Sequence, residues 1–108
     1  MSCCVTPVGM PSNLTRGFED DAKQVFPNNA FDAQNVQLAL HLHRAVLRAT
    51  HQSDRGVRRA RFLTVLRGQH CPAVLLEGGY LSHPKEAQRI ADWQFRQKLA
   101  EAIAQALK

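Results

Sequence analysis

Hydrophobic residues recur at spacings of three and four in two stretches of the chain, residues 33–50 and 93–107. Such spacing lines apolar side chains along one side of an α-helix. The apolar positions are Ala39, Leu42, Val46 and Ala49 in the first stretch and Phe95, Leu99, Ala102, Ile103 and Ala106 in the second. The pattern predicts two amphipathic helices, and Asp32 and Asp92 stand where their N-caps belong.

Short apolar runs predict three strands, at residues 4–6, 61–66 and 73–76. The buried side chains of the middle strand are expected to be Phe62, Val65 and Leu66. The run at 73–76 is the unbroken apolar kind that is typical of a strand buried on both faces. Strands that alternate with helices favour an α/β fold.

The remaining segments carry turn residues or few apolar positions. Residues 7–29 are rich in Pro, Asn, Ser and Gly and predict a long loop, with room for one helical turn at residues 18–26. Residues 53–56 form a turn cluster, in which Asp54, Arg55 and Gly56 are expected to fix the turn. A short helix is predicted over residues 84–91, with Ser82 or His83 near its start and Glu86 in its first turn.

Composition narrows the class of protein. The 108 residues suffice for one small domain, and no apolar run approaches the 18 residues or so of a membrane span. No basic segment followed by an apolar stretch is visible at the start, so no signal peptide is expected. The net charge is +5, but only Phe62 stands among the clustered arginines, which argues against nucleic-acid binding. Three cysteines without framework spacing argue against a disulfide scaffold, and Cys71 is expected to pack as a small apolar group.

Glu77 is the strongest candidate for chemistry. It ends the apolar run at residues 73–76 and directly precedes two glycines. A strand that ends in this way would place the carboxylate at the carboxyl edge of the sheet, where open α/β folds have their active sites. A solvated or ion-paired glutamate is the other interpretation of the same pattern.

The five histidines offer no metal site of their own. His41 and His43 are two residues apart, so on a regular helix they point about 200° from each other and cannot bind one ion. We expect both on the helix surface or in a groove, and Gln37, His41, Arg44 and Arg48 on the polar side of the helix. No set of three or four ligands stands at zinc-site spacing.

Two segments resemble the zinc-dependent N-acetylmuramoyl-L-alanine amidases of the amidase-3 type. Residues 72–84 read Pro-Ala-Val-Leu-Leu-Glu-Gly-Gly-Tyr-Leu-Ser-His-Pro, and residues 54–67 contain Arg-Gly-Val-Arg-Arg-Ala-Arg-Phe and Val-Leu-Arg. Both are similar to signatures of that family, except that His83 replaces an Asn. The resemblance covers roughly residues 33–108 and implies the C-terminal half of a three-layer α/β amidase fold with a mostly parallel sheet. Residues 1–31 would form a loop-rich segment and residues 32–108 the helix-strand-strand-helix core.

The resemblance also implies roles for individual residues. Glu77 would be the general base toward a zinc-bound water and then the proton donor to the leaving amine. Arg67 could contact an anionic part of a wall peptide or form a surface ion pair. Gly78 and Gly79 would carry the turn that aims Glu77, and Tyr80 would pack in the core. The substrate would be peptidoglycan, and the full-length family works in the periplasm or outside the cell.

The zinc ligands of the family, a His, a Glu and a second His, all precede the matched region. No complete zinc site is therefore expected in this chain, and we expect it to be inactive alone. One alternative is a non-catalytic peptidoglycan-binding or interaction remnant of the fold. Another is a piece that does not fold alone, because half a sheet leaves an unpaired edge and exposed apolar faces.

Overall fold

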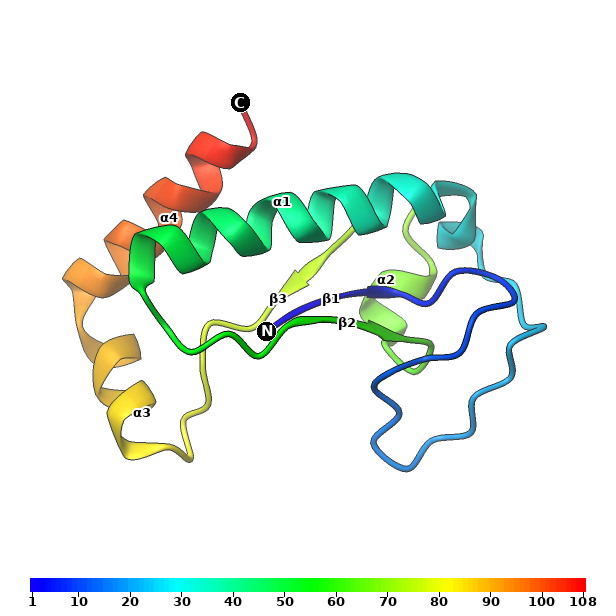
Figure 1. The fold of residues 1–108 in the computed structure, drawn as a ribbon, viewed down its shortest axis with the longest axis horizontal. Helices are drawn as coiled ribbons and strands as arrows, with labels where there is room; N and C mark the ends of the chain where they lie inside the picture. The colour runs from blue at the N-terminus through cyan, green and yellow to red at the C-terminus, as the bar shows by residue number, and fades with distance from the viewer.

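A computed structural model describes all residues, 1–108, as a small α/β structure in which helices pack on a three-stranded sheet (Figure 1). The strands are β1 (Ser2–Val5), β2 (Val57–Ala60) and β3 (Leu75–Leu76). The helices are a 3-10 turn η1 (Pro27–Phe31), α1 (Asp32–Thr50), α2 (Thr64–Arg67), α3 (Pro84–Ala91) and α4 (Trp93–Ala106). The predicted α/β class is confirmed.

The sheet is mixed, with strand order β2-β1-β3. β1 pairs in parallel with β2, Ser2 opposite Val57 and Val5 opposite Ala60. It pairs antiparallel with β3, Cys3 opposite Leu75. The central strand thus comes from the loop-rich first segment of the chain, and all four of its residues are buried.

Helix α1 lies across the sheet, as its pattern predicts (Figure 1). Ala39 and Leu42 are buried against the strands, and the four predicted polar positions are exposed. The predicted N-cap is wrong, because η1 runs directly into α1 and gives Asp32 a helical backbone. The Asp32 carboxylate instead accepts hydrogen bonds from the backbone N–H of Val8 (3.1 Å) and the side chain of Asn29 (2.8 Å).

The C-terminal helices follow the sequence prediction closely. α3 has the predicted bounds, and the His83 ring accepts a hydrogen bond from the Glu86 N–H at its start. The Asp92 carboxylate accepts from the Gln94 N–H, which confirms Asp92 as the N-cap of α4. The five apolar positions of α4 are half-buried, and the helix packs against α1.

The middle strand was predicted in the wrong place. The strand is Val57–Ala60, and the predicted segment instead holds the helical turn α2, with Leu66 buried but Val65 57% exposed. Pairing with β1 decides this, because sheet preference depends more on neighbouring strands than on the local residues. β1 begins two residues earlier than predicted, β3 keeps only the last two of its four, and the helical turn forms at Pro27–Phe31 rather than over 18–26.

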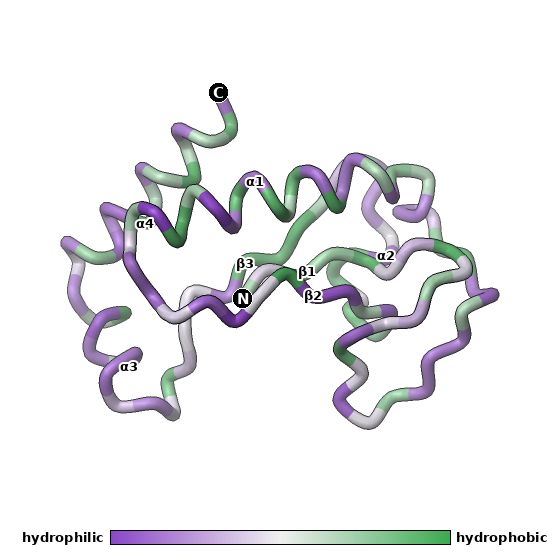
Figure 2. Tube along the Cα trace, viewed as in Figure 1, coloured by the Kyte–Doolittle hydropathy of each residue, from purple (hydrophilic) through white to green (hydrophobic).

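The structure is flat, with extents of 42 × 33 × 19 Å, and buries few residues, 13 of 108. Its surface of 6741 Å² exceeds the roughly 6,000 Å² expected of a compact chain of this mass. Hydrophobic segments gather along β1 and β3, and α3 is mostly hydrophilic (Figure 2). None of the helices combines the length and the apolar composition needed to cross a membrane.

Candidate active site

The backbone of Glu77 is held by Met1, the residue directly before β1. The Glu77 N–H donates to the Met1 carbonyl (2.9 Å), and the Met1 amine donates to the Glu77 carbonyl (3.2 Å). Glu77 therefore stands at the carboxyl end of β3, as expected. Since β3 runs antiparallel to β1, the same position is the amino end of β1 and β2, so the expected common carboxyl edge of the sheet does not form here.

The Glu77 carboxylate faces an arginine from the long loop. Nη2 of Arg16 lies 3.8 Å from Glu77 Oε2, and the two side chains are 46% and 22% exposed. Arg16 and Gly17 both have positive φ, 48° and 81°, and the Phe18 N–H donates to the Thr15 carbonyl. Positive φ at both central residues is typical of a type I′ turn, which here presents Arg16 toward the carboxylate.

The two glycines after Glu77 lie in an irregular segment that packs against α3. A Cβ at Gly79 would lie 3.3 Å from Ile90 Cδ1 and 3.4 Å from Glu86 Cβ, closer than most side chains allow. The Glu86 carboxylate accepts from the Tyr80 N–H (2.9 Å) and pairs with Arg55 (2.6 Å). Together these contacts hold the segment that follows Glu77. The predicted turn at Gly78 and Gly79 is wrong, because the chain turns later, at residues 80–83, where the His83 N–H donates to the Tyr80 carbonyl.

Glu86 and Arg55 also balance charge next to this segment. The hydrogen bond from the Tyr80 N–H, with the adjacent Arg55, lowers the pKa of Glu86. The Arg55 guanidinium also lies 4.6 Å from the centre of the Tyr80 ring. Tyr80 is 37% exposed, so the expected core position for it is wrong, and its ring serves as a platform for Arg55.

A buried histidine lies behind Glu77. His43 was expected on the helix surface or in a groove, but it is 8% exposed and bonds to Ser2 Oγ (2.9 Å) and Asp54 Oδ1 (2.7 Å). The hydrogen bond from His43, with that from the Gly56 N–H, lowers the pKa of Asp54. Asp54 and Gly56 thus fix the turn as predicted, and Gly56 has φ +81°. Ser2, His43 and Glu77 line one cavity of about 100 Å³.

The residues of this chain do not form a zinc site. No three His, Cys, Asp or Glu side chains come together in a way that could hold a metal ion. The charged side chain that pairs with Glu77 is an arginine, which cannot be a ligand to a cation. His41, which stands two residues before His43, lies away from it and bonds to the Ala106 carbonyl (2.8 Å).

Arg67 lies in a second hollow, which we call the aromatic hollow. Its volume is about 290 Å³, and its walls are Phe18, Glu19, Gln24, Arg61, Phe62, Thr64 and Arg67. The Arg67 guanidinium lies 4.8 Å from the centre of the Phe26 ring and pairs with no carboxylate. The alternative of a surface ion pair is therefore wrong for Arg67.

Arg16 links the aromatic hollow to Glu77. Its guanidinium carbon lies 5.8 Å from the centre of the Phe62 ring, while Nη2 faces Glu77. Phe62 stacks on Phe18 with ring centres 5.1 Å apart and planes 14° apart. Sequence reasoning missed Arg16 and Phe18, because nothing in a loop of this length indicates which residues fold back onto the sheet. The only local signal was Gly17, a turn residue.

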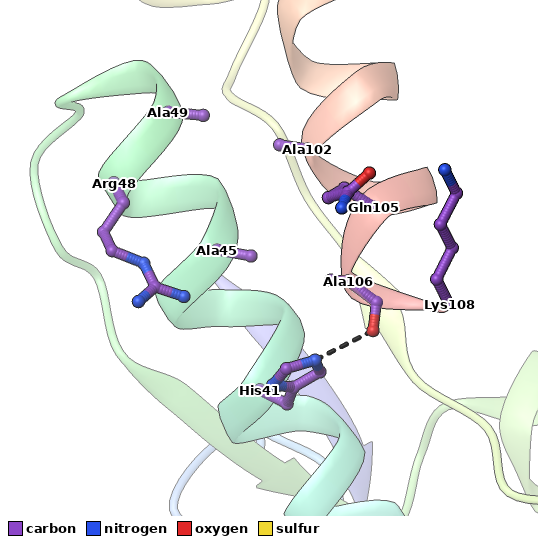
Figure 3. A pocket seen from close by; sticks show the side chains of 8 residues that line it. All are labelled: His41, Ala45, Arg48, Ala49, Ala102, Gln105, Ala106 and Lys108. Carbon is purple, nitrogen blue, oxygen red and sulfur yellow. Dashed lines mark hydrogen bonds between the residues drawn. The ribbon is translucent and has the colours of Figure 1, made fainter.

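The largest hollow is a groove between α1 and α4, of about 510 Å³ (Figure 3). Its floor is made by Ala45, Ala49, Ala102 and Ala106. His41 lines it, as expected of a groove residue, but neither Glu77 nor Arg67 does. This groove is separate from the candidate active site.

Comparisons with known proteins agree with the sequence signatures. The family model described as N-acetylmuramoyl-L-alanine amidase (Amidase_3) matches residues 13–108. The probable cell wall amidase LytH of Staphylococcus epidermidis is 33% identical over 106 residues, 86% of this chain and 36% of that protein. The putative N-acetylmuramoyl-L-alanine amidase YrvJ of Bacillus subtilis is 33% identical over 76 residues, 70% of this chain and 14% of that protein.

A LytH of Staphylococcus aureus is 46% identical over 56 residues, 52% of this chain and 19% of that protein. The chain thus spans about a third or less of the length of these curated relatives. No solved structure matches it.

Proposed function

Because this chain belongs to the N-acetylmuramoyl-L-alanine amidase (Amidase_3) family, we propose that it is the C-terminal part of a peptidoglycan amidase domain. The complete domain would hydrolyse the amide bond between N-acetylmuramic acid and L-alanine. Residues 1–31 would supply a loop-rich segment and residues 32–108 the helix-strand core, one half of a three-layer fold. The observation that carries this proposal is the placement of Glu77, the family-signature carboxylate, on a backbone fixed by β1 and packed by α3.

Glu77 is the proposed general base. It accepts a proton as water attacks the amide carbonyl, and it returns that proton to the nitrogen as the C–N bond breaks. A new C–O bond and a new N–H bond replace the bonds lost from amide and water. Its carboxylate is partly exposed, which leaves it accessible to substrate.

Zinc, which the family resemblance implies, does not fit the side chains of residues 1–108. We propose that its ligands belong to a segment other than these residues, and that the chain alone is inactive. The flat shape and the scarcity of buried residues support a missing layer. So does the roughly threefold greater length of LytH from S. epidermidis.

The proposed place of action is the cell wall, in the periplasm or outside the cell. Two observations support it: the relatives are described as cell wall amidases, and the proposed substrate is peptidoglycan.

The test joins this chain to the metal-binding N-terminal half of an active family member, with that intact enzyme as the positive control. We expect the fusion to release peptide from purified peptidoglycan, and Glu77→Gln to lower its rate by about 10²–10⁴-fold. The matched control is Glu101→Gln on the exposed side of α4, which should leave the rate unchanged. Full activity in the Glu77→Gln fusion would exclude Glu77 as the base.

The chain by itself supplies a separate test. We expect no peptide release by the 108 residues, with or without added zinc. Zinc-dependent release would contradict the proposed inactivity. Pelleting of the chain with sacculi that survives Glu77→Gln would favour the non-catalytic binding alternative.

A further inference from the structure

We propose that the aromatic hollow is a saccharide-binding site, in which a pyranose ring lies against Phe18 and its hydroxyl groups bond to the polar rim. The choice of an amino sugar as the ligand rests on the proposed function. The hollow itself is argued from its geometry alone.

The aromatic floor of the hollow comes from two distant parts of the chain. Phe18 belongs to the long loop and Phe62 precedes α2, and their rings stack nearly parallel. Phe18 nevertheless stays 62% exposed, so most of its ring meets solvent. An exposed ring held flat by a second ring presents an apolar face of the size of a sugar ring, whose axial C–H groups pack well on aromatic faces.

The rim of the hollow offers both donors and acceptors. Arg67 donates only, Glu19 accepts only, and Gln24 and Thr64 do both. Sugar hydroxyl groups are donors and acceptors at once, so a mixed rim of this kind can satisfy neighbouring hydroxyls. The volume of about 290 Å³ lies just below the usual range for ligand sites, roughly 300–1,000 Å³, and suits a single sugar ring.

The hollow is rigidly built rather than a chance gap between loops. The Arg61 side chain beneath it is 3% exposed and donates to Asp20 (2.6 Å) and to the carbonyls of Pro7 (3.1 Å) and Met10 (2.6 Å). The Phe26 ring lies against the guanidinium of Arg67 and orients it. A site ordered before binding loses less entropy when its ligand arrives.

A nucleic acid is the other ligand class that stacks on aromatic rings beside arginines. Two carboxylates argue against it here. Glu19 lines the hollow beside Arg67, and Asp20 forms an ion pair with Arg61 (2.6 Å). These two carboxylates offset the charges of Arg61 and Arg67, so the hollow has little net positive charge to attract a phosphate backbone. A neutral sugar does not need such charge.

The position of the aromatic hollow relative to Glu77 indicates what a sugar bound there would do for the reaction. Arg16 contacts Phe62 on one side and faces Glu77 on the other. A sugar chain bound in the hollow would therefore be held on the side of the molecule where the candidate base is presented. This would make Phe18 and Arg67 residues that position the glycan.

The test is an NMR titration of the complete 108-residue chain with tri-N-acetylglucosamine. We expect saturable shifts confined to the loop around Phe18 and to α2. Phe18→Ala should weaken binding at least tenfold, and Arg67→Gln several-fold. Trp93→Ala, which removes a similarly exposed aromatic (64%) from α4, is the matched control and should bind as the parent does.

Further variants keep the result decisive. If Phe18→Ala disturbs the fold, Phe18→Leu keeps the apolar bulk without the ring and should lose binding equally. Glu101→Gln, on the exposed side of α4, should bind as the parent does. The separate peptide-release assay of Glu77→Gln keeps a failure of the proposed base distinct from a failure of sugar binding. Unchanged binding by the Phe18 variants, equal loss in Trp93→Ala, or no binding by the parent would overturn the proposal. So would displacement of the sugar by a short single-stranded oligonucleotide.

Discussion

The hydroxyl oxygen of Ser2 lies 2.9 Å from Nδ1 of His43, although 41 residues separate the two along the chain. Asp54 Oδ1 lies 2.7 Å from the other ring nitrogen. The imidazole therefore joins the first residue of β1 to the middle of α1 and to the turn before β2. It is a buried polar link behind the strand end that carries Glu77.

Ser2→Ala should destabilise the fold, because it leaves a buried ring nitrogen without its partner. The expected loss in the free energy of unfolding is about 1–3 kcal/mol, measured by urea denaturation. Ser53→Ala is the matched control, since Ser53 is exposed and makes no side-chain hydrogen bond. Equal midpoints for the two variants would mean that the Ser2–His43 bond contributes nothing.

Two leucines on α1 test how the helix packs. Leu42 is 5% exposed and Leu40 is 38% exposed. Leu42→Ala should lower the free energy of unfolding by about 2–5 kcal/mol through lost burial and a residual cavity. Leu40→Ala should cost about 0.5 kcal/mol or less. A reversed order in urea denaturation would mean that α1 presents a different side to the sheet.

The close packing of Gly79 against α3 predicts a steric effect. Gly79→Ala would bring a methyl group within 3.3 Å of Ile90 Cδ1, so we expect a loss of about 1–3 kcal/mol in the free energy of unfolding. At Gly68 a Cβ would meet nothing within 4 Å and φ is −92°. Gly68→Ala should therefore be nearly neutral, and thermal melts of the two variants check the contrast.

The Asp20–Arg61 pair predicts a pH dependence. The pKa of Asp20 is lowered from 3.8 to about 2 in the folded state by hydrogen bonds from Ser12 and Arg61. Its contribution to stability is therefore complete above about pH 4 and is lost as the pH falls toward 2. Asp20→Asn should be less stable than the parent at pH 7, and the difference should shrink over that window.

The control for this pH effect is the neighbouring Asp21, which is exposed and caps only the Lys23 N–H. Asp21→Asn should follow the parent curve at every pH when denaturation midpoints are compared. A constant gap between parent and Asp20→Asn down to pH 2 would show that the Asp20 charge is not the source of the difference.

The three thiols should differ in reactivity. Burial raises the pKa of Cys3 and raises that of Cys4 to about 11, whereas Cys71 is exposed. The expectation that Cys71 packs in the interior is thus wrong. At pH 8 a thiol reagent should modify one cysteine quickly in the native chain and all three in urea. Rapid reaction of all three without denaturant would indicate that the isolated chain does not fold.

The local sequence pattern was enough to predict the elements that are stabilised by residues close together in sequence. Helices α1 and α4 have apolar positions at helical spacing, and Asp92 and His83 cap helices from within their own turns. Glu77 was identified in the same way, because a short apolar run and two glycines mark it without reference to the rest of the chain. In each case the interactions that define the element lie a few residues apart in sequence.

Only the tertiary structure decided the features that depend on distant partners. β2 forms at Val57–Ala60 because β1 lies beside it. The antiparallel pairing of β3 with β1 places the backbone of Glu77 next to Met1. Arg16 and Phe18 reach Glu77 and Phe62 across more than forty residues of chain. Strand pairing and loop placement are set by contacts between segments far apart in sequence. The local sequence pattern therefore determines the helices and identifies Glu77 as the candidate carboxylate. It does not determine which residues surround Glu77.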